Sequence, residues 1–248
     1  MGLSERVAVV TGGARGFGAA IGRELAGGGA RVVVADLDVE AAEATASELR
    51  RLGPAAVAVR TDVSVVADAR DLIVRTLERF GRLDVLINNA GICPLATIEE
   101  VTEELFDRVV AVNLKGVFFV SQAAVPVFKE QRSGKIVNVA SVGGKTGGMM
   151  PVAPYSATKA GVISLTKSFA SYLAPYGVAV NAVAPGPATT DLTRDWPADR
   201  MAALAQAIPF KRLARPEEIA AVVGFLASER CTYMTGEIVD VNGGLLMD

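Results

Sequence analysis

Short runs of β-branched and small apolar residues recur along the chain, and longer amphipathic stretches separate them. Such runs are typical of buried strands, and the stretches between them have the length and periodicity of helices. Seven runs are expected to be strands, at residues 6–12, 31–36, 56–62, 84–91, 135–141, 178–186 and 237–244. Because these runs lack a polar face, helices should cover both faces of their sheet. The pattern predicts an α/β fold with a seven-stranded, mostly parallel, doubly wound sheet.

The alternation of strands and helices runs through the whole chain without a Pro/Ser/Gly-rich linker, so a single domain over residues 1–248 is expected. One segment, residues 187–212, is polar and then weakly helical, and it interrupts the alternation. Ligands of open α/β sheets bind outside the carboxyl ends of the strands, and loops of this length are uncommon unless they are functional. We therefore predict a substrate lid at about 187–212, with an ordinary surface insertion as the alternative.

Composition excludes several classes of partner. The 25 Lys and Arg residues face 27 Asp and Glu residues, which leaves a net charge of −2 and no positive field for a nucleic acid. The N-terminal residues do not resemble a signal peptide, and no uncharged apolar run is long enough to span a membrane. Cys93 and Cys231 lie far apart, which fits free thiols in a reducing compartment, so a cytoplasmic location is expected.

The chain contains no histidine. This excludes Ser-His-Asp triads, HExxH zinc sites and imidazole bases, and no other spacing indicates a metal site. Acid/base chemistry must therefore use Tyr, Lys, Asp, Glu, Ser or Cys.

A glycine cluster, TGGARGFG at 11–18, follows the first predicted strand and opens the first predicted helix. Without side chains at Gly12, Gly16 and Gly18, a pyrophosphate could approach the backbone N–H groups at the positive end of the helix. A purely structural role in packing the helix onto the sheet is the alternative.

Asp36 closes the second predicted strand, 18 residues beyond Gly18. A carboxylate there can accept hydrogen bonds from ribose hydroxyls and would repel a 2′-phosphate, which favours NAD. Arg15, inside the glycine loop, could instead pair with that phosphate, so NADP is the less favoured cofactor.

The segment YSATK, residues 155–159, places Tyr155 and Lys159 one helical turn apart, just after Pro154, which suits the first turn of a helix. A tyrosine with its ordinary pKa of about 10 is a poor base, but a nearby ammonium and an oxidised nicotinamide would both lower that pKa. We predict that Tyr155 moves the proton and that Lys159 tunes it. An incidental pair on a helix surface is the alternative.

Six motifs together resemble the short-chain dehydrogenase/reductase family over essentially the whole chain. They are TGGARGFG (11–18), NNAG (88–91), Asn113 in NLKG, Ser141 in NVASVGG, YSATK (155–159) and PGPATT (185–190). The resemblance implies a single Rossmann-type domain, a nicotinamide dinucleotide and reversible oxidation of an alcohol to a carbonyl.

The resemblance also implies roles for single residues. Tyr155 would be the catalytic acid/base, Lys159 its partner, Ser141 the hydroxyl that positions the carbonyl, and Asn113 the residue that holds a water for proton relay. The implied cofactor-binding residues are Gly12, Arg15, Gly16, Phe17, Gly18, Asp36, Leu37, Asp62, Val63, Asn89, Ala90, Gly91, Tyr155, Lys159, Pro185, Gly186, Ala188 and Thr190. Two departures from the family pattern are Ala188, where a larger aliphatic residue is usual, and VNGG at 241–244 in place of VDGG.

Within this set the resemblance implies further detail. Asp62 and Val63 would lie beside the adenine, Asn89 and Gly91 under the ribose, and Thr190 at the nicotinamide carboxamide.

The substrate walls are expected to be largely apolar, from residues such as Met150, Pro151 and Val152, with Cys93 as a wall and not a nucleophile. This favours a neutral secondary alcohol or ketone, although Lys145 could meet an acidic group. Trp196 and Met201 could contact the substrate or anchor the lid.

One alternative is a 3-oxoacyl-[acyl-carrier-protein] or 3-oxoacyl-CoA reductase of the same family. Lys129, Arg132 and Lys135 form a small basic group that could meet an acidic carrier, but Asp36 argues against the NADPH that biosynthetic reductases generally use. A non-catalytic dinucleotide sensor is the second alternative. The resemblance also implies a homotetramer built on the helices at 103–130 and 154–174 and on the last strand, with a dimer as the alternative.

Overall fold

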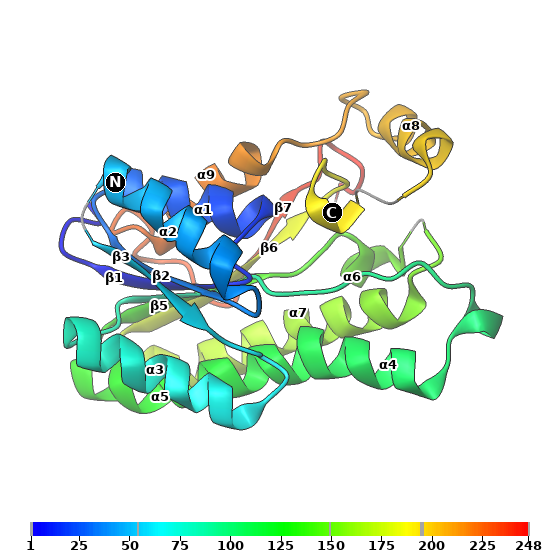
Figure 1. Cartoon of the computed structure of the whole chain (residues 1–248). Coiled ribbons are helices and arrows are strands. Elements are labelled where there is room, and N and C mark those ends of the chain that lie inside the picture. Colours follow the sequence, from blue (N-terminus) through cyan, green and yellow to red (C-terminus); the bar gives the residue numbers. More distant parts are fainter. Residues whose placement is uncertain (1, 54, 149, 194–195, 248) are drawn as a thin grey trace.

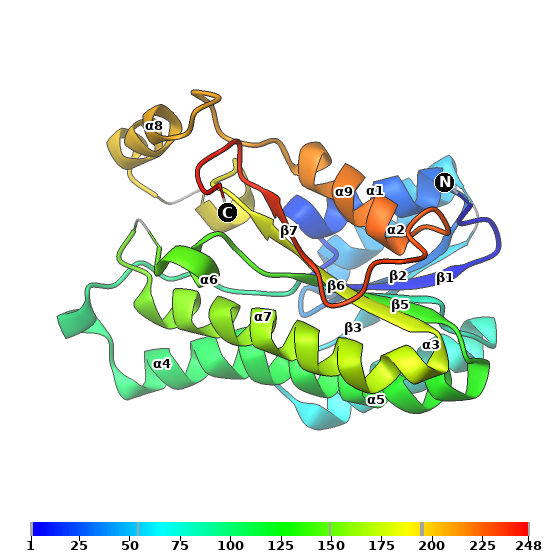
Figure 2. The same cartoon turned by 180° about the vertical axis from the view of Figure 1, so that it is seen from behind.

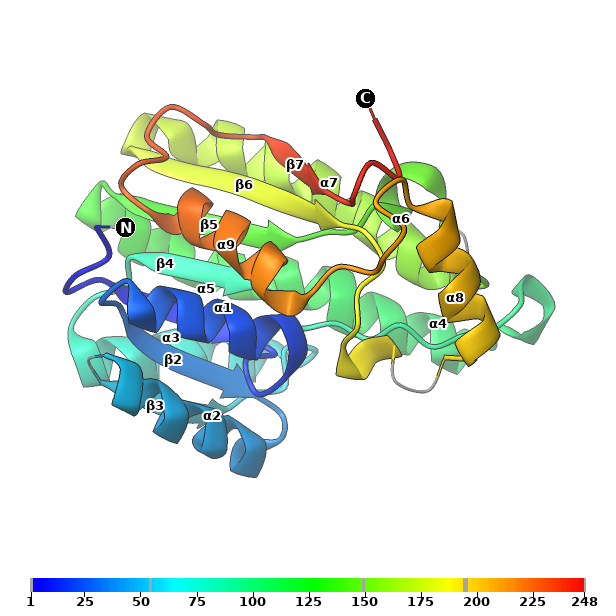
Figure 3. The ribbon, with the colours of Figure 1, turned by 90° about the horizontal axis from the view of Figure 1, so that it is seen from above.

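A computed structural model describes residues 2–53, 55–148, 150–193 and 196–247, so residues 194 and 195 of the predicted lid and both end residues of the predicted domain lie outside it. Seven strands form one sheet in the order β3-β2-β1-β4-β5-β6-β7, and every neighbouring pair is parallel (Figure 3). The predicted fold class is therefore confirmed. The strands are β1 (Val7–Thr11), β2 (Arg31–Asp36), β3 (Ala56–Arg60), β4 (Val85–Asn88), β5 (Gly134–Val139), β6 (Val178–Pro185) and β7 (Ile238–Val241).

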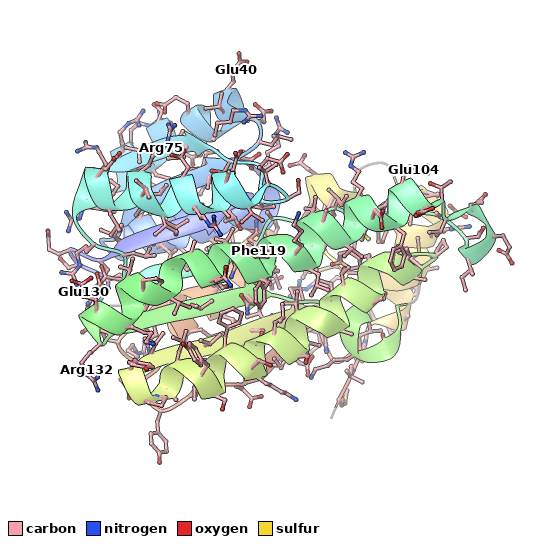
Figure 4. All side chains as sticks on the ribbon, turned by 90° about the horizontal axis from the view of Figure 1, so that it is seen from below. Glu40, Arg75, Glu104, Phe119, Glu130 and Arg132 are labelled. Carbon is pink, nitrogen blue, oxygen red and sulfur yellow. The ribbon has the colours of Figure 1, made fainter. Side chains whose placement is uncertain are left out.

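Helices cover both faces of the sheet. Figure 1 shows α1 (Gly16–Gly27), α2 (Val39–Leu52) and α9 (Pro216–Ala227) on one face, and the view from behind in Figure 2 agrees. The other face carries α3 (Val66–Phe80), α5 (Gly116–Gln131) and α7 (Ala153–Leu173), which Figure 4 shows from below. Successive strand side chains point to opposite faces, so Ala8 and Val10 pack toward α1 while Val9 packs toward α3. This two-sided burial explains why the strands lack polar positions.

Local sequence sets several helix ends. Asp38 caps α2 by accepting a hydrogen bond from the Ala41 amide at 3.1 Å, and Gly81 ends α3 in the left-handed conformation with φ of 75°. Pro154 lies in the first turn of α7, where its missing N–H leaves no helical bond unmade.

The helix that begins at Glu103 contains a π-helical turn. It runs from α4 (Glu103–Val110) through the π turn Ala111–Lys115 into α5 without interruption, so one helix spans Glu103–Gln131. By length and composition alone it could cross a membrane, since its most apolar 18-residue stretch has a mean hydropathy of 1.5. Its Val120, Ala124 and Phe128 side chains are instead buried against the sheet. The core helix of a soluble protein meets the same criterion, so the criterion is weak evidence for a membrane span.

The remaining elements are short or lie beyond the sheet. They are α6 (Gly143–Thr146), α8 (Ala198–Ala207) and the 3₁₀ turns Ile98–Glu100, Ala174–Tyr176 and Asp191–Thr193. In Figures 1 and 3, α6 and α8 lie beyond the same end of the sheet. This is the end at which β5 and β6 finish, because α6 follows β5 and the segment with α8 follows β6.

The strand order reverses at β1. The chain runs outward from β1 through β2 to β3, and it then crosses to β4 on the other side of β1. In open α/β sheets, ligands bind at the carboxyl ends of the strands beside such a reversal.

Candidate active site

A cavity of about 770 Å³ lies where this rule places it. Its lining comes from residues at or just after the carboxyl ends of β1, β2, β3, β4, β5 and β6, together with α7 and the segment around α8. The cavity collects every predicted site residue except Gly18 and Asn113. Residues scattered over more than 170 positions of sequence thus meet at one edge of the sheet.

The glycine loop leaves room only for backbone. Gly12 has φ of +61°, and a Cβ there would lie 2.8 Å from Cα of Ala90. A Cβ on Gly18 would lie 1.9 Å from the carbonyl oxygen of Gly12, so Gly18 closes the loop from behind and does not line the cavity. Both glycines therefore shape the loop, and α1 begins directly from it at Gly16 with its N-terminal amides free of side-chain caps.

Asn89 ties the end of β4 to this loop. Its Nδ2 donates to the carbonyls of Thr11 at 3.0 Å and Gly12 at 2.9 Å, and its own amide donates to the Thr11 hydroxyl at 3.1 Å. The amide of Ala90 donates to the same hydroxyl at 3.2 Å. Asn89 also lines the cavity, so the side chain predicted to lie under the ribose has a structural task as well.

The Asp36 carboxylate is held at the end of β2 by two backbone amides. Its Oδ2 accepts from Ala14 at 3.0 Å and its Oδ1 accepts from Asp38 at 3.1 Å. Leu37, the next residue, is 58 % exposed and lines the cavity. The carboxylate retains lone pairs for hydroxyl donors, which is the arrangement that a ribose requires.

Asp62 and Val63 follow β3 and line the same side of the cavity. Asp62 Oδ1 accepts from both the amide and the hydroxyl of Ser64, at 3.0 Å and 2.6 Å. This local turn fixes the backbone of residues 62–64 and packs Val63 against Gly116 on α5.

Ser141, Tyr155 and Lys159 meet at the centre of the cavity. Tyr155 and Lys159 project from the first turns of α7, and the Lys159 Nζ lies 5.6 Å from the centroid of the Tyr155 ring. Ser141 follows β5 and hydrogen-bonds the Tyr155 hydroxyl, while the amide of Gly143 donates to Ser141 Oγ at 3.0 Å. The predicted i, i+4 placement on one helix face therefore holds.

Burial dominates the pKa values of this group. It lowers the pKa of Lys159 to about 8, and it raises the pKa of Tyr155 above its ordinary value, against the hydrogen bond from Ser141. The sequence predicts that a nearby ammonium and an oxidised nicotinamide together lower the pKa of Tyr155, whereas burial in the protein alone raises it. The protein's own groups keep the phenol neutral, so stabilising a phenolate requires a further positive charge beside it.

Lys159 is anchored by the sheet. Its Nζ donates to the carbonyl of Val139, at the end of β5, at 2.6 Å, and the side chain is only 3 % exposed. With a pKa of about 8 the amine is still mostly protonated at neutral pH. Lys159 thus supplies a fixed cation next to the phenol ring.

Asn113 lies behind the cavity, inside the π-helical turn. Its Oδ1 accepts from the amide of Ile92 and its Nδ2 donates to the carbonyl of Ile92, both at 2.9 Å, with a further bond to the Thr158 hydroxyl at 3.3 Å. A Cβ on Gly91 would lie 3.3 Å from Asn113 Oδ1 and 3.7 Å from Lys159 Nζ. The Asn113 side chain therefore fixes the Gly91–Ile92 loop against α7, and its predicted role in proton relay stays a prediction.

From the sequence, Lys145 could meet an acidic group of the substrate or point to solvent. Lys145, on α6, forms an ion pair with Asp240 of β7 and does not line the cavity. The pair links α6, which follows Ser141, to the edge strand of the sheet.

Apolar residues form much of the remaining wall. Cys93, Met150 and Val152 line the cavity, and burial raises the pKa of the Cys93 thiol to about 12, so it is a neutral wall residue and no nucleophile. From the predicted lid, Trp196 lines the cavity but Met201 does not. The lining places the segment around α8 over the pocket; whether the segment opens and closes stays a prediction.

Sequence reasoning missed several lining residues. Asp107 and Arg108 lie one helical turn before Ala111 and Val112, and none of these four lining residues belongs to a motif. No sequence signal marks Leu245, which reaches the cavity from beyond β7. The other missed residues include Thr61, Ser64, Ile92, Val142, Thr146, Gly148, Ser156 and Leu204.

The cavity fits a nicotinamide dinucleotide. A side chain on Gly12 would collide with Ala90, and one on Gly18 would collide with the Gly12 carbonyl. The helix N-terminus lies open beyond Gly16, and Asp36 stands one strand away. Pro185, Gly186, Ala188 and Thr190 continue the lining past Tyr155 and Lys159. Among the described residues, no group of three or more His, Cys, Asp or Glu side chains could hold a metal ion.

Comparison with known proteins supports the same assignment. The family model described as enoyl-(acyl carrier protein) reductase matches residues 12–246. The cis-4-hydroxycyclohexanecarboxylate dehydrogenase of Sinomonas cyclohexanicum is 45 % identical over 243 residues, covering 98 % of this chain and 97 % of the relative.

Solved structures agree with the sequence relatives. A short-chain type dehydrogenase/reductase from Mycobacterium marinum superposes with a TM-score of 0.96 at 33 % identity, covering 100 % of this chain and 98 % of the other. A 3-ketoacyl-(acyl-carrier-protein) reductase from Brucella melitensis, complexed with NADH, superposes with a TM-score of 0.93 at 37 % identity, covering 99 % and 100 %. The chain belongs to the short-chain dehydrogenase/reductase family, a family of oxidoreductases that use nicotinamide dinucleotides.

Proposed function

We propose that this chain interconverts a neutral secondary alcohol and a ketone with NAD(H), and that Tyr155 is the acid/base. The observation that carries this proposal is the meeting of Ser141, Tyr155 and Lys159 in one cavity with the glycine loop and Asp36. Bound nicotinamide supplies the acceptor or donor of the hydride.

The protein's residues handle the proton and the orientation. In alcohol oxidation, Tyr155 Oη takes the hydroxyl proton as a phenolate, and Ser141 Oγ donates a hydrogen bond to the substrate oxygen. The Lys159 ammonium, held by the Val139 carbonyl, stabilises the negative charge on the phenolate. In ketone reduction the same phenol donates its proton to the carbonyl oxygen.

The lining favours an uncharged, compact substrate. Cys93, Met150, Val152 and Trp196 offer apolar contacts, and Lys145 is drawn away to Asp240. The relative from Sinomonas cyclohexanicum is named for an alcohol on a six-membered ring, which supports a cyclic secondary alcohol as the first substrate class to test.

Reduction of 3-oxoacyl thioesters is the second candidate, because the solved relative from Brucella melitensis is a 3-ketoacyl-(acyl-carrier-protein) reductase complexed with NADH. The basic group predicted to meet a carrier offers it little support. Lys129 Nζ lies 4.4 Å from the ring centroid of Tyr176, and Lys135 donates to the carbonyl of Cys231. Arg132 Nη2 donates to the carbonyl of Pro175 at 3.3 Å, so all three cations are engaged within the fold.

We also propose a cytoplasmic homotetramer. The most apolar 18-residue stretch of the helix Glu103–Gln131 is only 39 % buried in the single chain. Phe118 and Phe119 on α5 and Phe169 on α7 remain partly exposed, and the ring centroids of Phe118 and Phe169 lie 5.7 Å apart. A second copy of this chain, packing its own α5 and α7 against them, would cover this surface.

Replacing Tyr155 with phenylalanine tests the activity. We expect Tyr155→Phe to lower kcat for NAD⁺-dependent oxidation of cyclohexanol-type substrates by about 10²–10⁴-fold, because the phenol proton carrier is lost. NADH binding, followed by fluorescence, should persist. Tyr233→Phe, at a fully exposed tyrosine, is the control and should leave the rate unchanged. Unchanged turnover in Tyr155→Phe would refute the proposed chemistry.

A substrate panel separates the two candidates. Initial rates with NADH and with NADPH are compared on cyclic ketones, aryl ketones and acetoacetyl-CoA. Faster turnover of cyclic ketones with NADH supports the first function. A preference for the thioester would support the second.

A further inference from the structure

Arg15 lines the same cavity as Asp36, yet its guanidinium is engaged by another side chain. The loop before it is fixed from two sides: the amide of Ala14 donates to Asp36 Oδ2 at 3.0 Å, and the carbonyl of Ala14 accepts from the Thr45 hydroxyl of α2 at 2.8 Å. With its backbone anchored against β2 and α2, Arg15 extends its guanidinium to the N-terminus of α2. There it forms an ion pair with Asp38.

Asp38 has a fixed position of its own. Its side chain caps α2 through the Ala41 amide at 3.1 Å, and its amide donates to Asp36 Oδ1 at 3.1 Å. Arg15 and Asp36 line the cavity, whereas Asp38 stands just outside it. Asp38 therefore supports Asp36 through its backbone amide and holds Arg15 through its side-chain carboxylate.

We propose that Asp38 is a determinant of cofactor choice: by pairing with Arg15, it withholds from a 2′-phosphate the cation best placed to bind that phosphate. The inference rests on the proposed function, since it requires a dinucleotide in this cavity. Asp36 excludes the phosphate by direct repulsion, and Asp38 removes the group that could compensate for that repulsion.

The ion pair between Arg15 and Asp38 is exposed to solvent, which limits how much it can change the affinity for NADPH. The Arg15 and Asp38 side chains are 56 % and 41 % exposed, so solvent screens their attraction. Asp38 also adds its own negative charge near the ribose. The two contributions differ in range, because the pairing needs contact with Arg15 while the repulsion acts over several ångströms.

Asp38→Asn tests the proposal, since asparagine is as good a helix N-cap as aspartate and the fold of α2 should be retained. The affinities of the full-length protein for NADH and NADPH are measured by fluorescence titration, with no substrate present. We expect Asp38→Asn to tighten NADPH binding by about five-fold and to change NADH binding by less than about two-fold. The gain should shrink as ionic strength rises.

Glu40→Gln is the matched control. Glu40 lies in the first turn of the same helix, so its replacement removes the same charge from nearly the same place without touching Arg15. Its effect on NADPH binding should be less than about two-fold. A second variant, Asp38→Asn combined with Arg15→Ala, should lose the NADPH gain.

The outcomes separate this inference from the proposed function. Three results would overturn the role of Asp38 while leaving the proposed function intact. NADPH binding could tighten equally in Asp38→Asn and Glu40→Gln, it could stay tighter when Arg15→Ala is added, or it could fail to tighten in an Asp38→Asn protein that still binds NADH. A wild-type protein that binds neither NADH nor NADPH would overturn the proposed function, and this inference with it.

Discussion

Lys159 is buried at a cost to the folded protein. An ammonium removed from water is disfavoured, and the hydrogen bond to the Val139 carbonyl replaces only part of its hydration. Its lowered pKa reports that cost. Holding the Lys159 ammonium beside the phenol therefore lowers the stability of the folded protein.

The sign of the resulting pH dependence follows from proton binding. Burial lowers the pKa of Lys159 from 10.5 to about 8, so between these values the unfolded chain binds more protons than the folded protein. The destabilisation is complete below about pH 8 and fades as pH rises toward the ordinary value.

We therefore expect Lys159→Met to raise the free energy of unfolding above that of the wild type by about 1–3 kcal/mol at pH 7. At pH 9 this difference between variant and wild type should be smaller by about 1 kcal/mol. The activity of the variant should fall. Urea denaturation at the two pH values measures this difference. Lys167→Met, at an exposed lysine on the same helix, should show no such pH dependence. An advantage equal at both pH values would contradict the assignment of the cost to the Lys159 charge.

At the scale of elements, the contact between α6 and α7 sets the distance between Ser141 and Tyr155. Gly144 makes that contact possible, because a Cβ there would lie 2.7 Å from the backbone carbon of Lys159 and 2.8 Å from the Ala160 nitrogen. Both are backbone atoms of a long helix, so neither can move aside without moving α7.

Gly144→Ala should therefore destabilise the protein by about 1–3 kcal/mol and lower kcat, because α6 must shift and carry Ser141 with it. Gly27→Ala is the control, since a Cβ at this last residue of α1 meets nothing within 4 Å. Alanine should be neutral or slightly stabilising there. Thermal unfolding and steady-state kinetics measure both, and equal behaviour of the two variants would show that the close approach is not limiting.

The sequence predicted the strands well but placed two of their ends three residues too late. The run at 84–91 ends as a strand at Asn88, because the Asn89 side chain turns back to the carbonyls of Thr11 and Gly12. The run at 237–244 ends at Val241, because Gly243 and Gly244 adopt φ of +66° and +87°. Hydrophobic pattern records burial, and these residues are placed near the sheet without pairing in it.

The π-helical turn could not be predicted from local pattern. The turn contains Asn113, whose side chain exchanges two hydrogen bonds with the backbone of Ile92, 21 residues earlier in the chain. Local pattern does not record a contact over that separation. The site residues were predictable as a set because their motifs follow the ends of predicted strands. A contact such as that between Lys145 and Asp240 was not predictable, because it depends on the assembled sheet.

At the scale of the molecule, the candidate site and the proposed subunit contact lie on different parts of the fold. The cavity opens at the carboxyl ends of the strands, and the partly exposed phenylalanines lie on the outer faces of α5 and α7, where Figure 4 labels Phe119. A change on the outer face can therefore alter assembly without entering the cavity.

We expect Phe169→Glu to weaken assembly by at least about ten-fold, because a carboxylate buried between copies would lack a partner. Light scattering coupled to size-exclusion chromatography should find a tetramer for the wild type and smaller species for the variant. Val74→Glu, the same type of change at a half-exposed residue of α3, should remain tetrameric. A Phe169→Glu tetramer would mean that this face is not the interface.

The order of the strands also has a consequence for biosynthesis. Leu245 lines the cavity, and Asp240 of β7 holds α6 through Lys145. The lining at Leu245 and the position of α6 therefore depend on residues that are translated after all the motifs. A nascent polypeptide that already carries Ser141, Tyr155 and Lys159 still has an incomplete pocket while β7 is inside the ribosome. Oxidoreductase turnover should therefore begin only after β7 and Leu245 have left the ribosome, however early the first strands and helices have folded.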